Sequence, residues 1–148
     1  MRQVVIIILF LIGGYFFIKR ENERGNEIFE RGLEEPGLLF SGIITGIEEV
    51  NGYNGYGIIT IEILNSNVNE YDPRDTVDYY YCIIKGKIAE LYDHTTGILI
   101  GDTLNVDTKK RLISTGKKGN EHDEGSIRIN SSANYYKYIK QHTGFVRN

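Results

Sequence analysis

The chain has one cysteine, Cys82, and no tryptophan among its 148 residues. A single cysteine excludes an internal disulfide, so a hydrophobic core must hold the folded part together in either redox compartment. Basic residues are also scarce. Without residues 1–20, which carry three of the 17 basic groups and none of the 20 acidic ones, the net charge is −6. Binding to a phosphate backbone needs clustered Lys and Arg, so we expect no nucleic-acid partner.

Sequence signatures of catalysis and cofactor binding are missing as well. The chain contains no G-x-S-x-G, H-E-x-x-H, Walker-type or G-x-G-x-x-G pattern. Its most glycine-rich stretch, GYNGYG, is explained by Asn-Gly turn chemistry between two strands. We therefore predict no cofactor and no assigned catalytic residue, and we favour a non-enzymatic protein over an enzyme.

Two histidines lie next to acidic residues and are the candidates for a chemical site. His94 follows Asp93, and His122 precedes Asp123 in a loop flanked by glycines. A metal site needs three or four donors that converge in space, so we interpret the His122 region as a solvated acidic loop and predict no metal. The alternative function is a small membrane-anchored hydrolase that would pair Asp93, Asp102 or Asp123 with a histidine.

Alanine is scarce too, and its scarcity bears on the longest apolar run. Residues 4–18 (VVIIILFLIGGYFFI) carry no charge, and Lys19 and Arg20 close the run. As a helix it would reach about 22 Å, against a hydrocarbon core of about 30 Å, so a single pass requires snorkelling flanks or a thinned bilayer. A cleaved secretory signal is one alternative, but small residues should follow its apolar core, and the only alanines are Ala89 and Ala133. The other alternative is that residues 4–18 form a helix buried in the core of the domain.

We therefore predict a single-pass transmembrane anchor, a signal anchor, at residues 1–20 and a charged juxtamembrane stalk at residues 21–37. Pro36 and Gly37 end the stalk, because proline cannot continue a helix. The basic residues after the apolar run favour a cytoplasmic C-terminus, whereas a very short N-terminus before such a run is usual for an export signal anchor. We expect the remaining domain to be extracytoplasmic, that is periplasmic, and leave the opposite orientation open.

Residues 38–148 are predicted to form one small β-rich domain. Residues 38–50 and 57–64 look like strands, and the Asn-Gly pairs between them tolerate the positive φ angles of hairpin turns. Further strands are expected at 76–84, 98–106, 111–115 and 126–130. Residues 88–92 fit a strand or a helical turn, and residues 131–142 a closing helix or a last strand. Short strands with Gly-rich turns predict a mainly β fold, either a small OB/SH3-like β-barrel or a curled antiparallel sheet.

Eleven tyrosines are the most unusual feature of the composition. Tyr79, Tyr80 and Tyr81 are consecutive, so in a strand the middle ring faces away from its neighbours. Tyr135 and Tyr136 form a second cluster. Tyrosine is amphipathic and frequent at interfaces, which makes these residues candidates for binding a protein or envelope partner. The alternative is that tyrosine fills a half-buried sheet in place of tryptophan.

The layout of the chain resembles a group of proteins. The short anchor, the charged stalk and the Ile-, Tyr- and Asn-rich domain with a corner at Gly101, Asp102 and Thr103 look like the small, uncharacterised, membrane-anchored proteins of Bacteroidetes-type bacteria. The likeness covers layout and composition and brings no activity or functional residue with it. Cys82 departs from the lipoprotein members, because it is too far from the run for a lipid anchor. The sequence thus predicts a membrane-tethered binding or scaffold module that uses its tyrosines or the 116–125 loop.

Overall fold

The computed structural model describes residues 12–20, 23, 37–116, 122–127, 129–130 and 132–145. Most of the predicted anchor and stalk, including residues 4–11 of the apolar run, lies outside these residues. Residues 12–20 are helical, and their apolar side chains are exposed, Phe17 to 68%. In the described part of the chain, no helix has the length and apolar character needed to cross a membrane.

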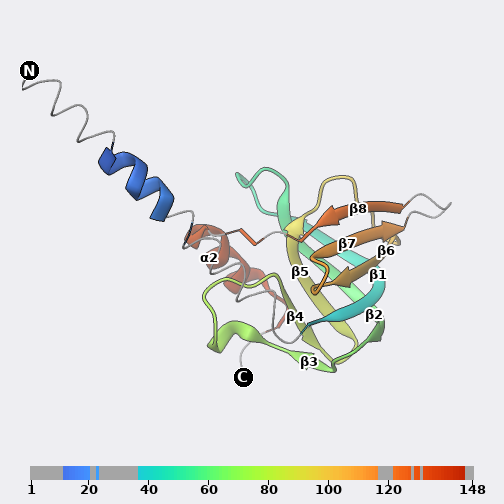
Figure 1. Cartoon of the computed structure of the whole chain (residues 1–148). Helices are drawn as coiled ribbons and strands as arrows, with labels where there is room; N and C mark the ends of the chain where they lie inside the picture. Colours follow the sequence, from blue (N-terminus) through green and yellow to red (C-terminus); the bar gives the residue numbers. More distant parts are fainter. Residues whose placement is uncertain are drawn as a thin grey trace, which may run out of the picture.

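The strands form one antiparallel sheet of eight in the order β3-β4-β5-β2-β1-β6-β7-β8 (Figure 1). Their bounds are β1 Leu39–Glu49, β2 Tyr56–Ser66, β3 Glu70–Tyr71, β4 Cys82–Lys85, β5 Ile88–His94, β6 Thr103–Asp107, β7 Leu112–Gly116 and β8 His122–Ser126. The mainly β prediction is confirmed. The closed-barrel alternative is wrong, because β3 and β8 are the two ends of an open sheet.

The β1–β2 hairpin forms where the Asn-Gly pairs predict it. Val50 donates its backbone N–H to the carbonyl of Tyr56 at 2.9 Å, which closes the loop. Asn54 and Gly55 both adopt positive φ angles, 49° and 81°, in the left-handed region that these residue types tolerate best. The turn residues therefore set the register of the two longest strands.

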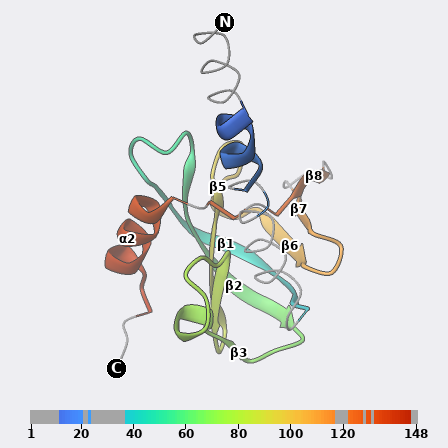
Figure 2. The ribbon, with the colours of Figure 1, turned by 60° about the vertical axis from the view of Figure 1, so that its left-hand side comes forward.

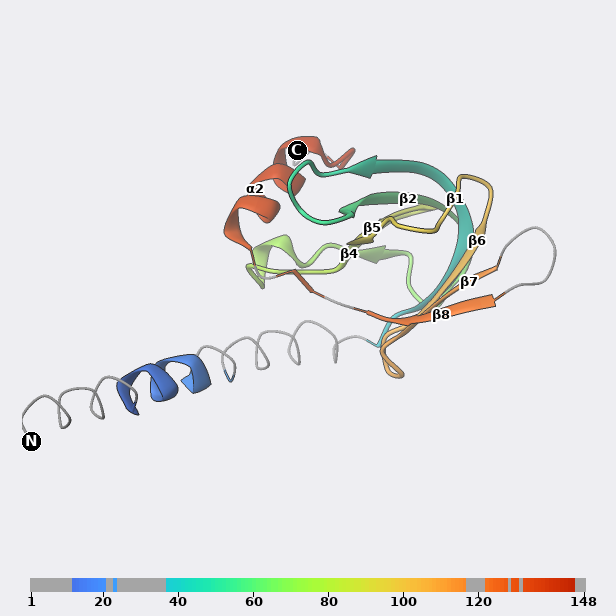
Figure 3. The same cartoon turned by 90° about the horizontal axis from the view of Figure 1, so that it is seen from above.

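Two glycines that lie inside strands and not in turns, Gly42 in β1 and Gly57 in β2, allow the sheet to bend. An added Cβ at Gly42 would overlap the carbonyl oxygen of Glu62, and one at Gly57 would overlap that of Glu48. The β1–β2 register also shifts beside Gly42, as in a β-bulge. Figure 3 shows the result: β1 curves along its length, and β6, β7 and β8 turn back below the rest of the sheet.

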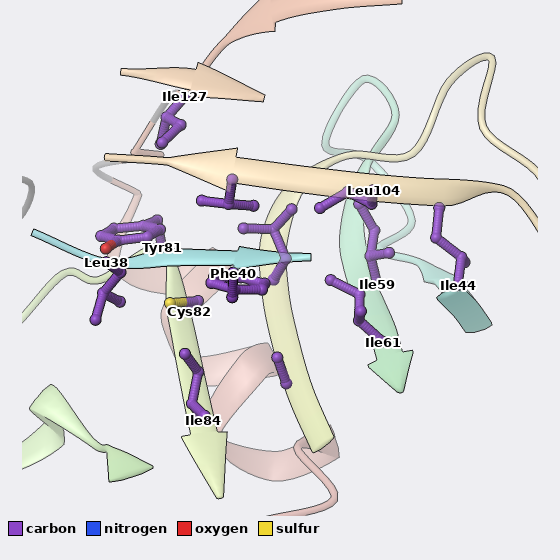
Figure 4. Packing of buried hydrophobic residues seen from close by; sticks show 13 residues of the cluster. Leu38, Phe40, Ile44, Ile59, Ile61, Tyr81, Cys82, Ile84, Leu104 and Ile127 are labelled. Atoms are coloured by element: carbon purple, nitrogen blue, oxygen red, sulfur yellow. The ribbon is translucent and has the colours of Figure 1, made fainter. Parts of the chain in front are cut away.

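Two hydrophobic cores lie on the two faces of the β4–β5–β2 portion of the sheet. The inner core lies inside the bend (Figure 4) and is formed by Leu38, Phe40, Ile44, Ile59, Ile61, Tyr81, Cys82, Ile84, Ala89, Leu91, Leu104, Val106 and Ile127. The helix core lies on the opposite face and is formed by Val50, Ile58, Tyr80, Ile83, Tyr92, Tyr135, Tyr136 and Ile139. These three strands are therefore buried on both sides.

Helix α2 (Ala133–His142) covers the outer face, and Figure 2 shows it on the opposite side of β5 from β6–β8. The side chain of Ser132 accepts a hydrogen bond from the N–H of Tyr135, as an N-cap does. Tyr135 and Ile139 lie one turn apart, and both are fully buried. The predicted closing helix is thus confirmed, and the strand alternative for this segment is wrong.

Other sequence predictions need correction. The strand expected at 76–84 is limited to Cys82–Lys85, because a 3₁₀ turn at Pro73–Asp75 and the packing of Tyr80 on α2 occupy the preceding chain. Residues 88–92 belong to strand β5. The strand expected at 126–130 is wrong: β8 ends at Ser126 and includes part of the expected loop. Its register follows the pairing with β7, which the local alternation at 126–130 does not reveal.

Candidate functional site

The structure places the five candidate tyrosines mostly in the interior. Tyr80, Tyr81, Tyr135 and Tyr136 are 0–3% exposed, and Tyr79 is half-buried. Tyr80 enters the helix core and Tyr81 the inner core, so consecutive rings do face opposite sides. Tyr80, Tyr135 and Tyr136 hold α2 and the sheet together, and Tyr81 is buried on the other face. Tyr79 and the edge of Tyr136 are therefore the surface that a ligand can contact.

Tyr136 is fixed in place by its neighbours. Its hydroxyl accepts a hydrogen bond from the N–H of Tyr80 at 3.1 Å and donates one to the carbonyl of the same residue. The rings of Tyr79 and Tyr80 meet it edge-on at centroid distances of 5.1 and 5.2 Å. Burial raises the pKa of the Tyr136 phenol well above its ordinary value, so the group acts as a hydrogen-bonding anchor and not as an acid.

A groove of about 420 Å³, here called the α2 groove, runs between α2 and the chain before β4. Tyr79 and Tyr136 provide its aromatic surface. Lys137 and Lys140 lie on its helical side and are both exposed, while Asp78 lies across from them. The groove is also lined by Ala133 and Gln141. Its volume falls within the range of small-ligand sites, about 300–1,000 Å³.

The end of α2 is held by a buried carboxylate. Glu90, on β5, is 5% exposed, and its side chain accepts hydrogen bonds from the Tyr92 hydroxyl at 2.9 Å, the Thr143 hydroxyl at 2.6 Å and the Gly144 N–H at 2.7 Å. We call this arrangement the Glu90 clasp. Because it joins β5 to the residues after α2, it fixes the groove wall that carries the lysines.

An ion-pair cluster extends this attachment. The Arg74 guanidinium donates to the carbonyl of Phe145 at 2.7 Å and also binds both carboxylate oxygens of Asp72. Lys85 lies 3.3 Å from the same carboxylate. These contacts, led by the Arg74 hydrogen bond, lower the pKa of Asp72 to about 2. The residues on both sides of the groove are therefore held to a rigid sheet.

A second concavity, the β5–β8 hollow, has a volume of about 340 Å³. It is lined by Asp93, His94, Thr96, Ile113, Gly125 and Ser126. Four strands separate β5 from β8 in the sheet order, so only the bend of the sheet brings these residues together. Asp93 is 5% exposed and accepts the backbone N–H of His94 at 2.7 Å. The His94 ring packs on Tyr56 at 3.9 Å between centroids.

The residues named for the hydrolase alternative are only partly assembled. Asp93 and His94 line one hollow, whereas Asp102 accepts the N–H of Leu99 at 2.9 Å and so stabilises its own turn. Asp123 belongs to β8, but its side chain is outside the described residues. Within the part that the structure covers, no three His, Cys, Asp or Glu residues gather as metal ligands. The hydrolase alternative stays a prediction.

Cys82 does not fit the role of a nucleophile. Its side chain is fully buried in the inner core, and burial raises the pKa of its thiol. A buried, protonated thiol is inert, because the thiolate is the reactive form. Sequence reasoning missed the lysines of the α2 groove, although Lys137 and Lys140 are spaced i,i+3 beside Tyr136 and so share one face of the expected helix.

No protein-family model matches the chain, and it matches neither a curated protein nor a solved structure. The resemblance to membrane-anchored Bacteroidetes-type proteins therefore stays a prediction, and the function must be argued from the geometry.

Proposed function

We propose that the protein is a membrane-tethered, non-enzymatic binding module that holds an anionic partner in the α2 groove. The tether is the apolar run at residues 4–18, and the exposed apolar side chains of helical residues 12–18 support it, since contiguous apolar surface usually marks a contact with membrane or protein. The observation that carries the binding role is the combination of Tyr79, Tyr136, Lys137 and Lys140 around one groove.

The charge of the groove argues for an anionic partner. Lys137 and Lys140 extend from one helical face, while the chain beyond residue 20 has a net charge of −6. A local excess of positive charge in an acidic domain attracts carboxylate or phosphate groups, and it steers their approach. Asp78 on the other side disfavours a ligand that is negative throughout. A protein segment or envelope component with separate acidic and neutral parts fits both walls.

The structure of the groove suits binding better than catalysis. Tyr79 contributes a half-buried ring beside the fixed ring of Tyr136, and aromatic surfaces of this kind provide contact area at little cost in conformational entropy. The titratable groups lining the groove are two exposed lysines, two tyrosines and one exposed aspartate. Burial is a usual means of shifting the pKa of a catalytic group. The two lysines and the aspartate of the groove are all exposed and lack that burial.

A crosslinking experiment in cells tests the proposal. A photoactivatable amino acid at Gln141, which lines the groove and is exposed, should form a defined adduct in the membrane fraction. Lys137→Glu with Lys140→Glu should remove most of that adduct, because the charge of one wall is reversed. Lys87→Glu is the matched control, since Lys87 is exposed in the β4–β5 turn and outside the groove.

Two outcomes would contradict the proposal. An adduct that survives the double substitution, or one that a probe at Lys87 forms equally well, would show that the groove is not the contact surface. If the protein is found entirely in the soluble fraction, the proposed membrane attachment through residues 4–18 is wrong. Protease treatment of intact cells then determines whether residues 38–148 are extracytoplasmic, as the sequence predicts.

A further inference from the structure

The chain contains two Asn-Gly pairs, Asn51-Gly52 and Asn54-Gly55, and both lie in the loop between β1 and β2. Asn-Gly is the dipeptide most prone to spontaneous deamidation, because glycine has no side chain to shield its backbone nitrogen from the preceding Asn side chain. Each pair is followed by tyrosine, so the local sequence gives the two sites nearly the same reactivity. Any large difference between them must come from the fold.

The first pair lies at the centre of a turn that can change its conformation. The N–H of Tyr53 donates to the carbonyl of Val50 at 3.2 Å, and the φ of Gly52 is 86°, whereas that of Asn51 is negative. This is a type II turn, which differs from type I by a rotation of the central peptide group, and both types accept Asn at the first central position. Asn51 and Gly52 are exposed, and an added Cβ on Gly52 would meet open space. The Gly52 nitrogen can therefore turn towards the Asn51 side chain while the hydrogen bond that closes the turn stays intact.

The second pair is held in place. Asn54 and Gly55 have φ angles of 49° and 81°, which define a type I′ turn. Rotation of its central peptide group would give a type II′ turn, which favours glycine at the position of Asn54. The carbonyl of Gly55 also accepts hydrogen bonds from the N–H and the hydroxyl of Thr95 at 2.7 and 2.8 Å, and an added Cβ on Gly55 would overlap the Thr96 hydroxyl. These contacts resist the backbone rotation that cyclisation needs.

We propose that Asn51 is a site of spontaneous deamidation and that the fold protects Asn54 from the same reaction. The backbone nitrogen of Gly52 loses its proton and attacks Cγ of Asn51. An N–Cγ bond forms, the Cγ–Nδ2 bond breaks, and the side-chain amide group takes up a proton and leaves as ammonia. Water then opens the succinimide ring: cleavage of the N–Cγ bond gives aspartate, and cleavage of the bond from the nitrogen to the main-chain carbonyl carbon gives isoaspartate.

Peptide mapping of the full chain tests the inference. The protein is reconstituted into lipid nanodiscs and incubated at neutral pH in water enriched in heavy oxygen, which labels only the residues that deamidate during the incubation. Electron-transfer fragmentation then separates Asn51 from Asn54, and aspartate from isoaspartate. In the folded protein, deamidation should be at least about tenfold faster at Asn51 than at Asn54, the factor expected when one site must pass through a strained backbone conformation.

Unfolding the protein provides the matched control. In concentrated urea the turns are lost, so the rates at Asn51 and Asn54 should become nearly equal. Thr95→Val keeps the shape of the side chain but removes the hydroxyl that donates to Gly55. This variant should deamidate about three- to tenfold faster at Asn54, the equivalent of one net hydrogen bond, and at the unchanged rate at Asn51. Thermal melting by circular dichroism checks that the variant is folded, and the urea comparison tests the inference on the unaltered protein.

Three results would overturn the inference. Equal rates at the two sites in the folded protein, or a faster rate at Asn54, would show that the turn types do not select the site. A folded protein that stays unmodified at Asn51, while the unfolded chain reacts at both sites, would show that the first turn is protected too. A preference for Asn51 that persists unchanged in urea would assign the selection to the local sequence and not to the fold.

Discussion

The Glu90 clasp makes the sharpest prediction about stability. Replacing Glu90 by Ala removes the acceptor for the Tyr92 hydroxyl, the Thr143 hydroxyl and the Gly144 N–H. Replacing it by Gln keeps the shape: the amide oxygen can accept from Gly144, and the amide nitrogen can donate to the two hydroxyls once their hydrogens rotate. The two substitutions therefore separate lost hydrogen bonding from lost charge.

The expected magnitudes follow from burial. Tyr92 is fully buried, so its orphaned hydroxyl costs about 1–3 kcal/mol, whereas Thr143 is half-buried and Gly144 exposed, so water replaces part of their bonds. We expect Glu90→Ala to lower the free energy of unfolding by about 3 kcal/mol. Glu90→Gln exchanges charge-assisted bonds for neutral ones and should cost about 1 kcal/mol.

Urea unfolding followed by circular dichroism measures both values, and hydrogen exchange locates the effect. In Glu90→Ala, exchange should accelerate in α2 and residues 143–145 well before it accelerates in β1 and β2, because the clasp joins the helix to β5. Equal costs for Ala and Gln, or a uniform loss of protection across the sheet, would refute this account of the clasp.

Three further predictions concern other sites. Arg74 holds the pKa of Asp72 at about 2, below its ordinary value. The Asp72 carboxylate therefore contributes about 1 kcal/mol to the free energy of unfolding above pH 4, and this contribution is lost as the pH falls towards 2. Asp72→Asn should remove this part of the pH dependence of stability in urea titrations. The buried Cys82 thiol should react with DTNB at neutral pH only as fast as the protein unfolds, so rapid stoichiometric labelling of the native protein would contradict its burial. Gly57→Ala should cost more than about 2 kcal/mol, because its Cβ overlaps the opposite strand, while Gly125→Ala, which has open space, should be nearly neutral in thermal melts.

The β1–β2 hairpin and helix α2 can be predicted from the sequence, because neighbouring residues determine both. Asn54 and Gly55 define the hairpin through their own φ preferences, and Ser132 defines the start of α2 by accepting the N–H of Tyr135. The i,i+4 spacing of Tyr135 and Ile139 shows which face of the helix is buried. Each of these features depends on residues close together in the chain, which a sequence displays directly.

The remaining features depend on contacts between distant segments. Gly42 and Gly57 look like ordinary glycines in the sequence, yet they lie against the backbone of a neighbouring strand, and the bend of the sheet brings Asp93 beside β8. In the sequence, the amphipathic character of Tyr80 and Tyr136 makes them candidates for binding a partner. Their rings are buried because α2 packs on the sheet at that point, 56 residues away in the chain, and no local pattern shows that.

The position of α2 after all eight strands also bears on how the protein is made. Synthesis proceeds from the N-terminus, so the outer face of β2, β4 and β5, with Ile58, Ile83 and Tyr92, is complete before its cover has been translated. In that interval the nascent domain exposes a continuous apolar and aromatic surface, the kind that chaperones bind and that promotes aggregation. Chains truncated before residue 133 should therefore be insoluble and rapidly degraded, even though every strand of the sheet is present.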